Sequence, residues 1–115
     1  MRRNLNMTYI VENNGCYGLT KGHDSTTMDT DSVSKKGDIN PYMPIDLVRV
    51  GIEVGATFVG RSFSGDKAQL VPLIKAAISH RGFTLLDVIS PCVTFNNHQG
   101  SIKSYASFRK HNDAM

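Results

Sequence analysis

The 115-residue sequence predicts an α/β fold, in which a partial parallel sheet is flanked by helices. Strand-like segments alternate with helical segments along the chain. This alternation is typical of a parallel sheet whose right-handed crossovers place helices on its faces. The strand-like segments are residues 7–11, 56–60 and 83–90. Because so few strands make a poor sheet, we expect the back half of a larger α/β domain.

Composition narrows the class of protein. Hydrophobic residues make up 40% of the chain and charged residues 20%, as in ordinary globular proteins. The net charge of +3 is small and spread out, so we expect no nucleic-acid partner. No apolar stretch approaches the roughly 18 residues of a membrane-spanning helix, and the N-terminal residues lack the apolar region of a signal peptide. We therefore predict a cytoplasmic protein without membrane association.

The chain has two cysteines, Cys16 and Cys92, 76 residues apart. In a reducing compartment we expect no disulfide between them. Cys16 is open to two interpretations, a small partly buried side chain or a reactive thiol, and the first is the commoner role of a free cysteine.

The first strand, residues 7–11, is apolar at nearly every position and ends at Asn13-Asn14-Gly15. Continuous apolarity predicts a strand that is buried on both faces. Residues 12–44 follow with little periodicity and many turn-forming residues. A connection of this length is usually either functional or disordered.

Two helices are predicted around the second strand. Residues 45–55 place Ile45, Val48 and Ile52 at helical spacing, with Gly55 as the stop. Residues 62–82 contain the clearest helical pattern in the chain, formed by Leu70, Leu73, Ile74, Ala77 and Ile78.

In this second helix we expect Ser64 as the N-cap and Gly82 as the C-cap. Pro72 predicts a kink or a late start. The segment "SFSGDK" also resembles a phosphate loop, but it lacks the required spacing, and helix capping explains its residues. The third strand ends at Pro91, a polar loop follows, and residues 104–115 form a last, frayed helix.

The stretch "NNGCYGLTKG", residues 13–22, directly follows the first strand. In open α/β sheets, ligands bind beyond the carboxyl ends of the strands. An asparagine amide and backbone carbonyls are oxygen ligands that Mg²⁺ prefers, and glycines let the backbone approach a phosphate. The residues therefore indicate a loop for phosphate and magnesium, with a plain turn as the commoner alternative. The histidines, by contrast, show no zinc spacing.

Together, "YGLTKG", "RSFSGDK" and "DVISPCVTFNNH" resemble the beta subunit of 2-oxoacid:ferredoxin oxidoreductases of the 2-oxoglutarate type. The resemblance extends over nearly the whole chain. It implies that residues 1–115 are the C-terminal part of a thiamine diphosphate-binding domain, truncated at the N-terminus, and that residues 12–44 form its cofactor-binding loop. The implied reaction decarboxylates a 2-oxoacid, captures the acyl group on coenzyme A and reduces ferredoxin, with an alpha subunit completing the enzyme.

The resemblance also assigns roles to individual residues. Asn14 would offer its side-chain oxygen to Mg²⁺, and Cys16 its backbone carbonyl. Lys21 would face the anionic substrate as a catalytic residue, and its alternative is a solvated loop lysine. Cys92 would join other cysteines around a [4Fe–4S] cluster, and its alternative is a buried side chain. The remaining residues expected to approach thiamine diphosphate are Tyr17, Gly18, Leu19 and Thr20.

The sequence departs from the family at three places. His23 stands where the family commonly has glutamine. The Gly-Asp-Gly-Asp run of the magnesium segment and the N-terminal cysteines do not occur in these 115 residues. We therefore expect the isolated chain to be inactive. A second hypothesis, a non-catalytic remnant or a fragment that only associates with a subunit, stands beside the enzyme hypothesis.

Overall fold

The computed structural model describes residues 1–33, 37–99, 101 and 103–111. The chain divides into two compact units. The first, here called the sheet unit, comprises Met1–Glu12 and Asp46–Ile89. The second, here called the loop unit, comprises Asn13–Ile45 and Ser90–Met115.

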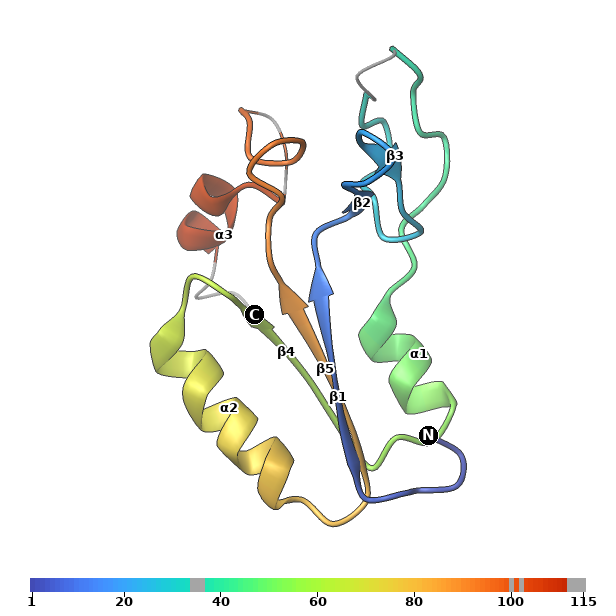
Figure 1. Cartoon of the computed structure of the whole chain (residues 1–115), viewed down its shortest axis with the longest axis vertical. Coiled ribbons are helices and arrows are strands. Elements are labelled where there is room, and N and C mark those ends of the chain that lie inside the picture. The colour runs from blue at the N-terminus through green and yellow to red at the C-terminus, as the bar shows by residue number, and fades with distance from the viewer. Residues whose placement is uncertain (34–36, 100, 102, 112–115) are drawn as a thin grey trace. The chain divides into compact units, whose positions relative to one another are not determined.

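The sheet unit is built on a three-stranded parallel sheet with the order β1-β5-β4 (Figure 1). The strands are β1 (Met7–Asn13), β4 (Phe58–Phe63) and β5 (Phe83–Ile89). β4 and β5 pair in parallel from Phe58 opposite Thr84 to Phe63 opposite Ile89. The predicted α/β class and the predicted parallel sheet are therefore confirmed.

Two helices, α1 (Leu47–Glu53) and α2 (Lys67–Ser79), lie on opposite sides of this sheet (Figure 1). Every residue of β5 is buried, as its apolar sequence predicts. The helical face predicted for α2 is confirmed in its main part, but Ile78 is 69% exposed. The core consists of Ala77, Leu86 and Val88, with Phe58, Leu70, Leu73 and Ile74 packed against it.

The predicted N-cap of α2 is wrong. Asp66 is the N-cap, and its carboxylate accepts a hydrogen bond from Gln69 N at 3.1 Å. Ser64 instead continues the pairing of β4, because its N–H donates to Ile89 O at 2.9 Å. Because Ser64 pairs with β5, it is not available to cap α2, although the local sequence pattern predicts it as the cap.

The predicted C-cap of α2 is also wrong, because the cap is His80. Gly82 lies beyond it with φ at +134°, and a Cβ there would lie 2.6 Å from Asn4 Oδ1. Asn4 Oδ1 accepts a hydrogen bond from Phe83 N at 2.8 Å, so Gly82 makes room for the residue that holds the start of β5. Pro72 lies inside the helix, which starts at Lys67.

The N-terminus of α1 is joined to the sheet by Arg61. The carboxylate of Asp46, the N-cap of α1, accepts from Val48 N at 3.0 Å and from Arg61 at 2.6 Å. Arg61 also donates to the fully buried carboxylate of Asp87 at 3.0 Å. Burial alone would raise the pKa of Asp46, but the hydrogen bonds from Arg61 and the helix N–H groups outweigh it and lower this pKa. The ion pairs therefore fix the beginning of α1 against β4 and β5.

The prediction that β1 is buried on both faces is wrong for this chain. Met7, Tyr9 and Ile10 are exposed. β1 is an edge strand of the sheet, whereas α1 and α2 pack against β4 and β5. An apolar strand sequence indicates that a strand prefers burial, but burial requires an element that covers it.

The loop unit contains more regular structure than the sequence indicates. Within residues 12–44, β2 (Cys16–Tyr17) and β3 (His23–Asp24) form an antiparallel hairpin. The last helix, α3 (Tyr105–His111), starts as predicted, and residues 112–115 of its predicted span lie outside the described residues. None of the helices in the described ranges has the length and apolarity needed to cross a membrane.

Candidate functional site

The candidate site is the β2–β3 hairpin and the turn that leads into it. Asn14 Oδ1 accepts a hydrogen bond from Cys16 N at 3.1 Å, which closes an Asx turn around Gly15. Gly15 needs to be glycine, because its φ is +73° and a Cβ would lie 3.0 Å from Asn96 Nδ2. The predicted oxygen ligand of Asn14 therefore sits on a fixed turn.

The carbonyl oxygen of Cys16 accepts no hydrogen bond from the opposite strand of the hairpin. Ser25 N donates to Gly15 O at 3.1 Å, and Cys16 lies opposite Asp24. Together these make Cys16 and Asp24 a non-hydrogen-bonded pair, in which the carbonyls of the paired residues point away from the partner strand and the side chains lie close together. The geometry leaves the Cys16 oxygen available as a ligand and brings the Asp24 carboxylate toward the Cys16 thiol.

The tip of the hairpin is a tight turn from Tyr17 to Gly22. Gly22 N donates to Tyr17 O at 3.0 Å and Lys21 N to Gly18 O at 3.1 Å. The Thr20 hydroxyl donates to Tyr17 O at 3.3 Å. Lys21 is exposed and has a φ of +63°, the left-handed region that non-glycine residues avoid. Strained backbone of this kind is found preferentially at functional positions.

Apolar surface is also presented at this tip, because Leu19 is 98% exposed. The glycines there have different roles. A Cβ on Gly22 would lie 2.7 Å from Phe95 Cδ1, so the fold requires this glycine. A Cβ on Gly18 would meet nothing within 4 Å, so the chain itself gives no packing reason for a glycine.

The two cysteines lie next to each other. Cys16 is buried and Cys92 is half-buried, and both are free thiols. Burial, the neighbouring Cys92 side chain and the nearby Asp24 carboxylate together raise the pKa of the Cys16 thiol to about 11, with burial as the largest cause. At neutral pH the Cys16 sulfur is therefore a protonated thiol, and the chemically useful atom of this residue for a hard cation is its carbonyl oxygen.

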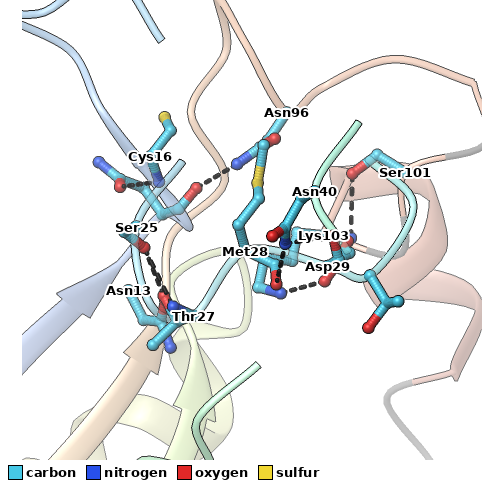
Figure 2. A network of polar contacts seen from close by, with 12 residues as sticks. Asn13, Cys16, Ser25, Thr27, Met28, Asp29, Asn40, Asn96, Ser101 and Lys103 are labelled. Atoms are coloured by element: carbon cyan, nitrogen blue, oxygen red, sulfur yellow. Dashed lines mark hydrogen bonds and ion pairs between the residues drawn. The ribbon is translucent and has the colours of Figure 1, made fainter. Parts of the chain in front are cut away.

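A network of polar side chains connects the hairpin to neighbouring parts of the loop unit (Figure 2). The Thr27 hydroxyl donates to Asn13 Oδ1 at 2.7 Å and lies 2.9 Å from the Ser25 hydroxyl. Asn40, only 7% exposed, donates from its side chain to the carbonyls of Met28, Asp29 and Tyr42. The described part of the long connection is therefore folded around buried amides.

Two residues near the C-terminus complete the network (Figure 2). Asn96 Nδ2 donates to Asn14 O, and Lys103 forms a buried ion pair with Asp29. Sequence reasoning missed both residues, as well as Asn13, Thr27 and Asn40. Only Asn40 carried a local signal, since Asn-Pro marks a turn.

The loop unit also has an open pocket of about 470 Å³, a volume that suits a small molecule. Its polar lining comes from Asp24, Ser25, Thr26 and Asn40. Its apolar lining comes from Met28, Ile39, Pro41, Tyr42, Met43 and Ile45.

The predicted site residues form two groups, those of the hairpin and Cys92, and the fold places the two groups near each other. Asn14, Cys16 and the segment 17–21 share one hairpin, and Cys92 lies beside Cys16. The oxygens of Asn14 and Cys16 suit Mg²⁺ as neutral ligands, with further oxygens expected from a bound phosphate. A [4Fe–4S] cluster takes four thiolates, and the described residues contain only the pair Cys16 and Cys92, of which Cys16 is buried. For a cluster, this chain therefore offers one suitable ligand, Cys92.

Comparison with protein families matches residues 1–88 to the thiamine pyrophosphate enzymes, C-terminal TPP binding domain. Among curated proteins, the chain is 43% identical over 103 residues to the 2-oxoacid:ferredoxin oxidoreductase subunit beta of Saccharolobus solfataricus, covering 84% of this chain and 32% of that protein. It is 39% identical over 101 residues to the 2-oxoglutarate oxidoreductase subunit KorB of Mycobacterium tuberculosis, covering 84% of this chain and 26% of that protein.

Among solved structures, the chain is similar to 2-oxoglutarate:ferredoxin oxidoreductase from Magnetococcus marinus with 2-oxoglutarate, coenzyme A and succinyl-CoA bound. The TM-score is 0.85 at 34% identity, and the match covers 95% of this chain and 36% of that one. The chain thus spans about a third of the length of these relatives.

Proposed function

The chain belongs to the family of thiamine pyrophosphate enzymes through their C-terminal TPP-binding domain, and from this premise we propose that it is a segment of a 2-oxoacid:ferredoxin oxidoreductase beta subunit. The complete enzyme would decarboxylate a 2-oxoacid oxidatively, form the acyl-coenzyme A and reduce ferredoxin. Its partner would be an alpha subunit. The observation that carries the proposal is the ordered hairpin after β1, which keeps a carbonyl and an amide oxygen available at the carboxyl end of a parallel strand.

Asn14 and Cys16 would hold Mg²⁺ through the Asn14 side-chain oxygen and the Cys16 carbonyl. The Asx turn supports this role, because it fixes both oxygens before any ligand arrives. Neither oxygen carries a charge, so the affinity of this segment for Mg²⁺ depends on the diphosphate and on carboxylates from elsewhere.

The hairpin tip would face the cofactor and the substrate. Thiamine diphosphate, when bound, supplies the carbanion chemistry of the decarboxylation. Gly18 would let the backbone approach the diphosphate, and Leu19 would place its exposed side chain against an apolar part of the cofactor. Lys21 would bind the carboxylate of the 2-oxoacid by charge and hydrogen bonding. We favour 2-oxoglutarate, because names of several relatives specify it.

Cys92 would provide one thiolate of a [4Fe–4S] cluster, with the other ligands supplied from outside this segment. Its position supports the proposal, since Cys92 follows β5 and Asn96 hydrogen-bonds both to the Cys92 carbonyl and to the Asn14 carbonyl of the candidate magnesium loop.

The test uses the complete two-subunit enzyme that contains this segment. The proposal predicts ferredoxin reduction that requires 2-oxoglutarate, coenzyme A, thiamine diphosphate and Mg²⁺, and its loss in Asn14→Ala. Asn6→Ala, a change at an exposed asparagine before β1, is the matched control and should keep full activity. An assembled enzyme without such activity, or one that is fully active as Asn14→Ala, contradicts the proposal.

A further inference from the structure

The open pocket of the loop unit borders the candidate magnesium loop. Asp24 lines this pocket, and it lies opposite Cys16 in the pairing of β2 with β3. Ser25 is the next residue of the lining, and its backbone N–H donates to Gly15 O at 3.1 Å. A ligand in the pocket would therefore lie beside the turn that carries the candidate magnesium ligands.

The pocket contains a hydrogen-bond acceptor that lacks a donor. Asp24 Oδ1 is buried and accepts no hydrogen bond from any residue that the structure describes. A buried acceptor without a donor is costly, and buried oxygens in native proteins are nearly always hydrogen-bonded. Asp24 Oδ1 is thus placed to accept from an N–H or O–H group of a molecule in the pocket.

The other buried polar side chains of the lining already have partners. Asn40 donates to three nearby backbone carbonyls, and its oxygen accepts from Tyr42 N at 3.2 Å. The Ser25 hydroxyl lies 2.9 Å from the Thr27 hydroxyl. The Asp24 carboxylate therefore decides which polar group a ligand can place here.

The lining disfavours an anion. Among the described residues, no lysine, arginine or histidine lines the pocket, and the Asp24 carboxylate would repel a phosphate or a second carboxylate. The remaining lining is largely apolar. Met28 is buried, whereas Ile39, Tyr42 and Met43 expose large apolar side chains at its open side. The pocket thus suits an uncharged, mostly apolar group that carries a hydrogen-bond donor.

We propose that this pocket binds the pantetheine arm of coenzyme A. The inference rests on the proposed function, in which coenzyme A accepts the acyl group. The arm is uncharged, its methyl and methylene groups suit the apolar lining, and its amide N–H groups can donate to Asp24 Oδ1. It also ends in the thiol that must reach the reaction site, which agrees with a pocket beside Cys16. The adenine also carries a donor, but it lies at the other end of coenzyme A, next to the phosphates that the lining disfavours.

The experiment measures binding of pantetheine to the complete two-subunit enzyme by calorimetry, so its readout does not depend on turnover. Asp24→Ala removes the acceptor and should weaken pantetheine binding about tenfold. Asp24→Asn keeps an oxygen acceptor and should restore much of the affinity. Adenosine bisphosphate, the nucleotide end of coenzyme A without the arm, should bind equally to the wild type and to both variants.

A matched pair of variants tests the apolar wall. Ile39 and Val33 are each 62% exposed and face each other in an isolated bridge, but of the two only Ile39 lines this pocket. Ile39→Trp fills the pocket and should weaken pantetheine binding and raise the KM for coenzyme A, with kcat and the KM for the 2-oxoacid unchanged. Val33→Trp is the control and should change none of these quantities.

Three results overturn the proposal: a folded wild-type enzyme that does not bind pantetheine, unchanged binding by Asp24→Ala, or equal binding by Ile39→Trp and Val33→Trp. A protein partner that covers the pocket would give the first of these results. The two proposals fail separately. An enzyme that binds pantetheine in the predicted pattern but does not reduce ferredoxin with a 2-oxoacid contradicts the proposed function alone, and an active enzyme without the pattern contradicts the pocket assignment alone.

Discussion

Lys103 and Asp29 form an ion pair across 74 residues of sequence, and it is almost fully buried, with side-chain exposures of 9% and 15%. The pair joins the segment before α3 to the loop that supports the candidate site. Lys103 also packs beside Gly15, where a Cβ would lie 3.1 Å from Lys103 Cδ. The shape of the loop around Asn14 thus depends on a residue close to the C-terminus.

Lys103→Met should destabilise the folded chain by about 3 kcal/mol, because it leaves the Asp29 carboxylate buried without its partner. Urea unfolding followed by circular dichroism measures the change. Lys110→Met, at an exposed lysine of α3, is the matched control and should change stability by less than about 0.5 kcal/mol.

Lys103→Met combined with Asp29→Leu should recover part of this loss, since no unpaired charge stays buried. A double variant that is as unstable as the sum of the two single variants would show that the side chains do not act as a pair.

Gly18→Ala should keep the stability of the chain and weaken its affinity for thiamine diphosphate about tenfold, because the methyl group occupies space that a diphosphate would need. Gly22→Ala should instead destabilise the fold by about 1–3 kcal/mol through its contact with Phe95 and its positive φ. Calorimetric binding and thermal unfolding on both variants separate the two effects. Unaltered binding by Gly18→Ala would remove Gly18 from the proposed site.

Lys21→Gly should stabilise the hairpin by about 1 kcal/mol, because glycine adopts the observed φ of +63° without strain. In the complete enzyme the same change should lower kcat/KM for the 2-oxoacid, since the cation is lost. Lys21→Ala removes the charge without relieving the backbone, so it should lower kcat/KM equally and give no gain in stability. Full activity of both variants would identify Lys21 as a solvated loop residue.

The stability of the sheet unit should fall in acid partly through Asp46. Its pKa is lowered in the folded state, so its contribution is present above the unfolded pKa of about 3.9 and is lost as the pH falls through the folded pKa. Asp46→Asn keeps an N-cap acceptor but loses the ion pair with Arg61. Its urea midpoint should therefore change less than that of the wild type between neutral pH and about pH 2. Identical pH profiles would contradict this role of the ion pair.

The sequence predicted most of the sheet unit because its signals are local. The spacing of Leu70, Leu73, Ile74 and Ala77 identifies α2, and the apolar run from Phe83 to Ile89 identifies β5. The prediction of the N-cap of α2 was wrong because pairing between strands decides the position of Ser64. The burial of β1 was wrong because it depends on what covers the strand.

The candidate site was predictable only in part. "NNGCYGLTKG" marks the hairpin, and the resemblance to a family supplied roles for its residues. The supporting network gave no such signal, because Lys103 and Asn96 look like ordinary surface residues until distant partners bury them. The proximity of the segments that carry Cys16 and Cys92 was hidden in the same way, since it follows from the adjacency of β1 and β5.

The most direct test of the account is a calorimetric titration of thiamine diphosphate into the complete two-subunit enzyme that contains this segment, with and without Mg²⁺. The account predicts saturable binding that requires Mg²⁺, that persists in Asn14→Asp and that disappears in Asn14→Ala. Asn14→Asp keeps both the Asx turn and the oxygen ligand, so it separates loss of the metal ligand from a change of side chain at this position. Equal binding by Asn14→Ala and the wild type, or no binding by an assembled enzyme that circular dichroism shows to be folded, would contradict the central claim.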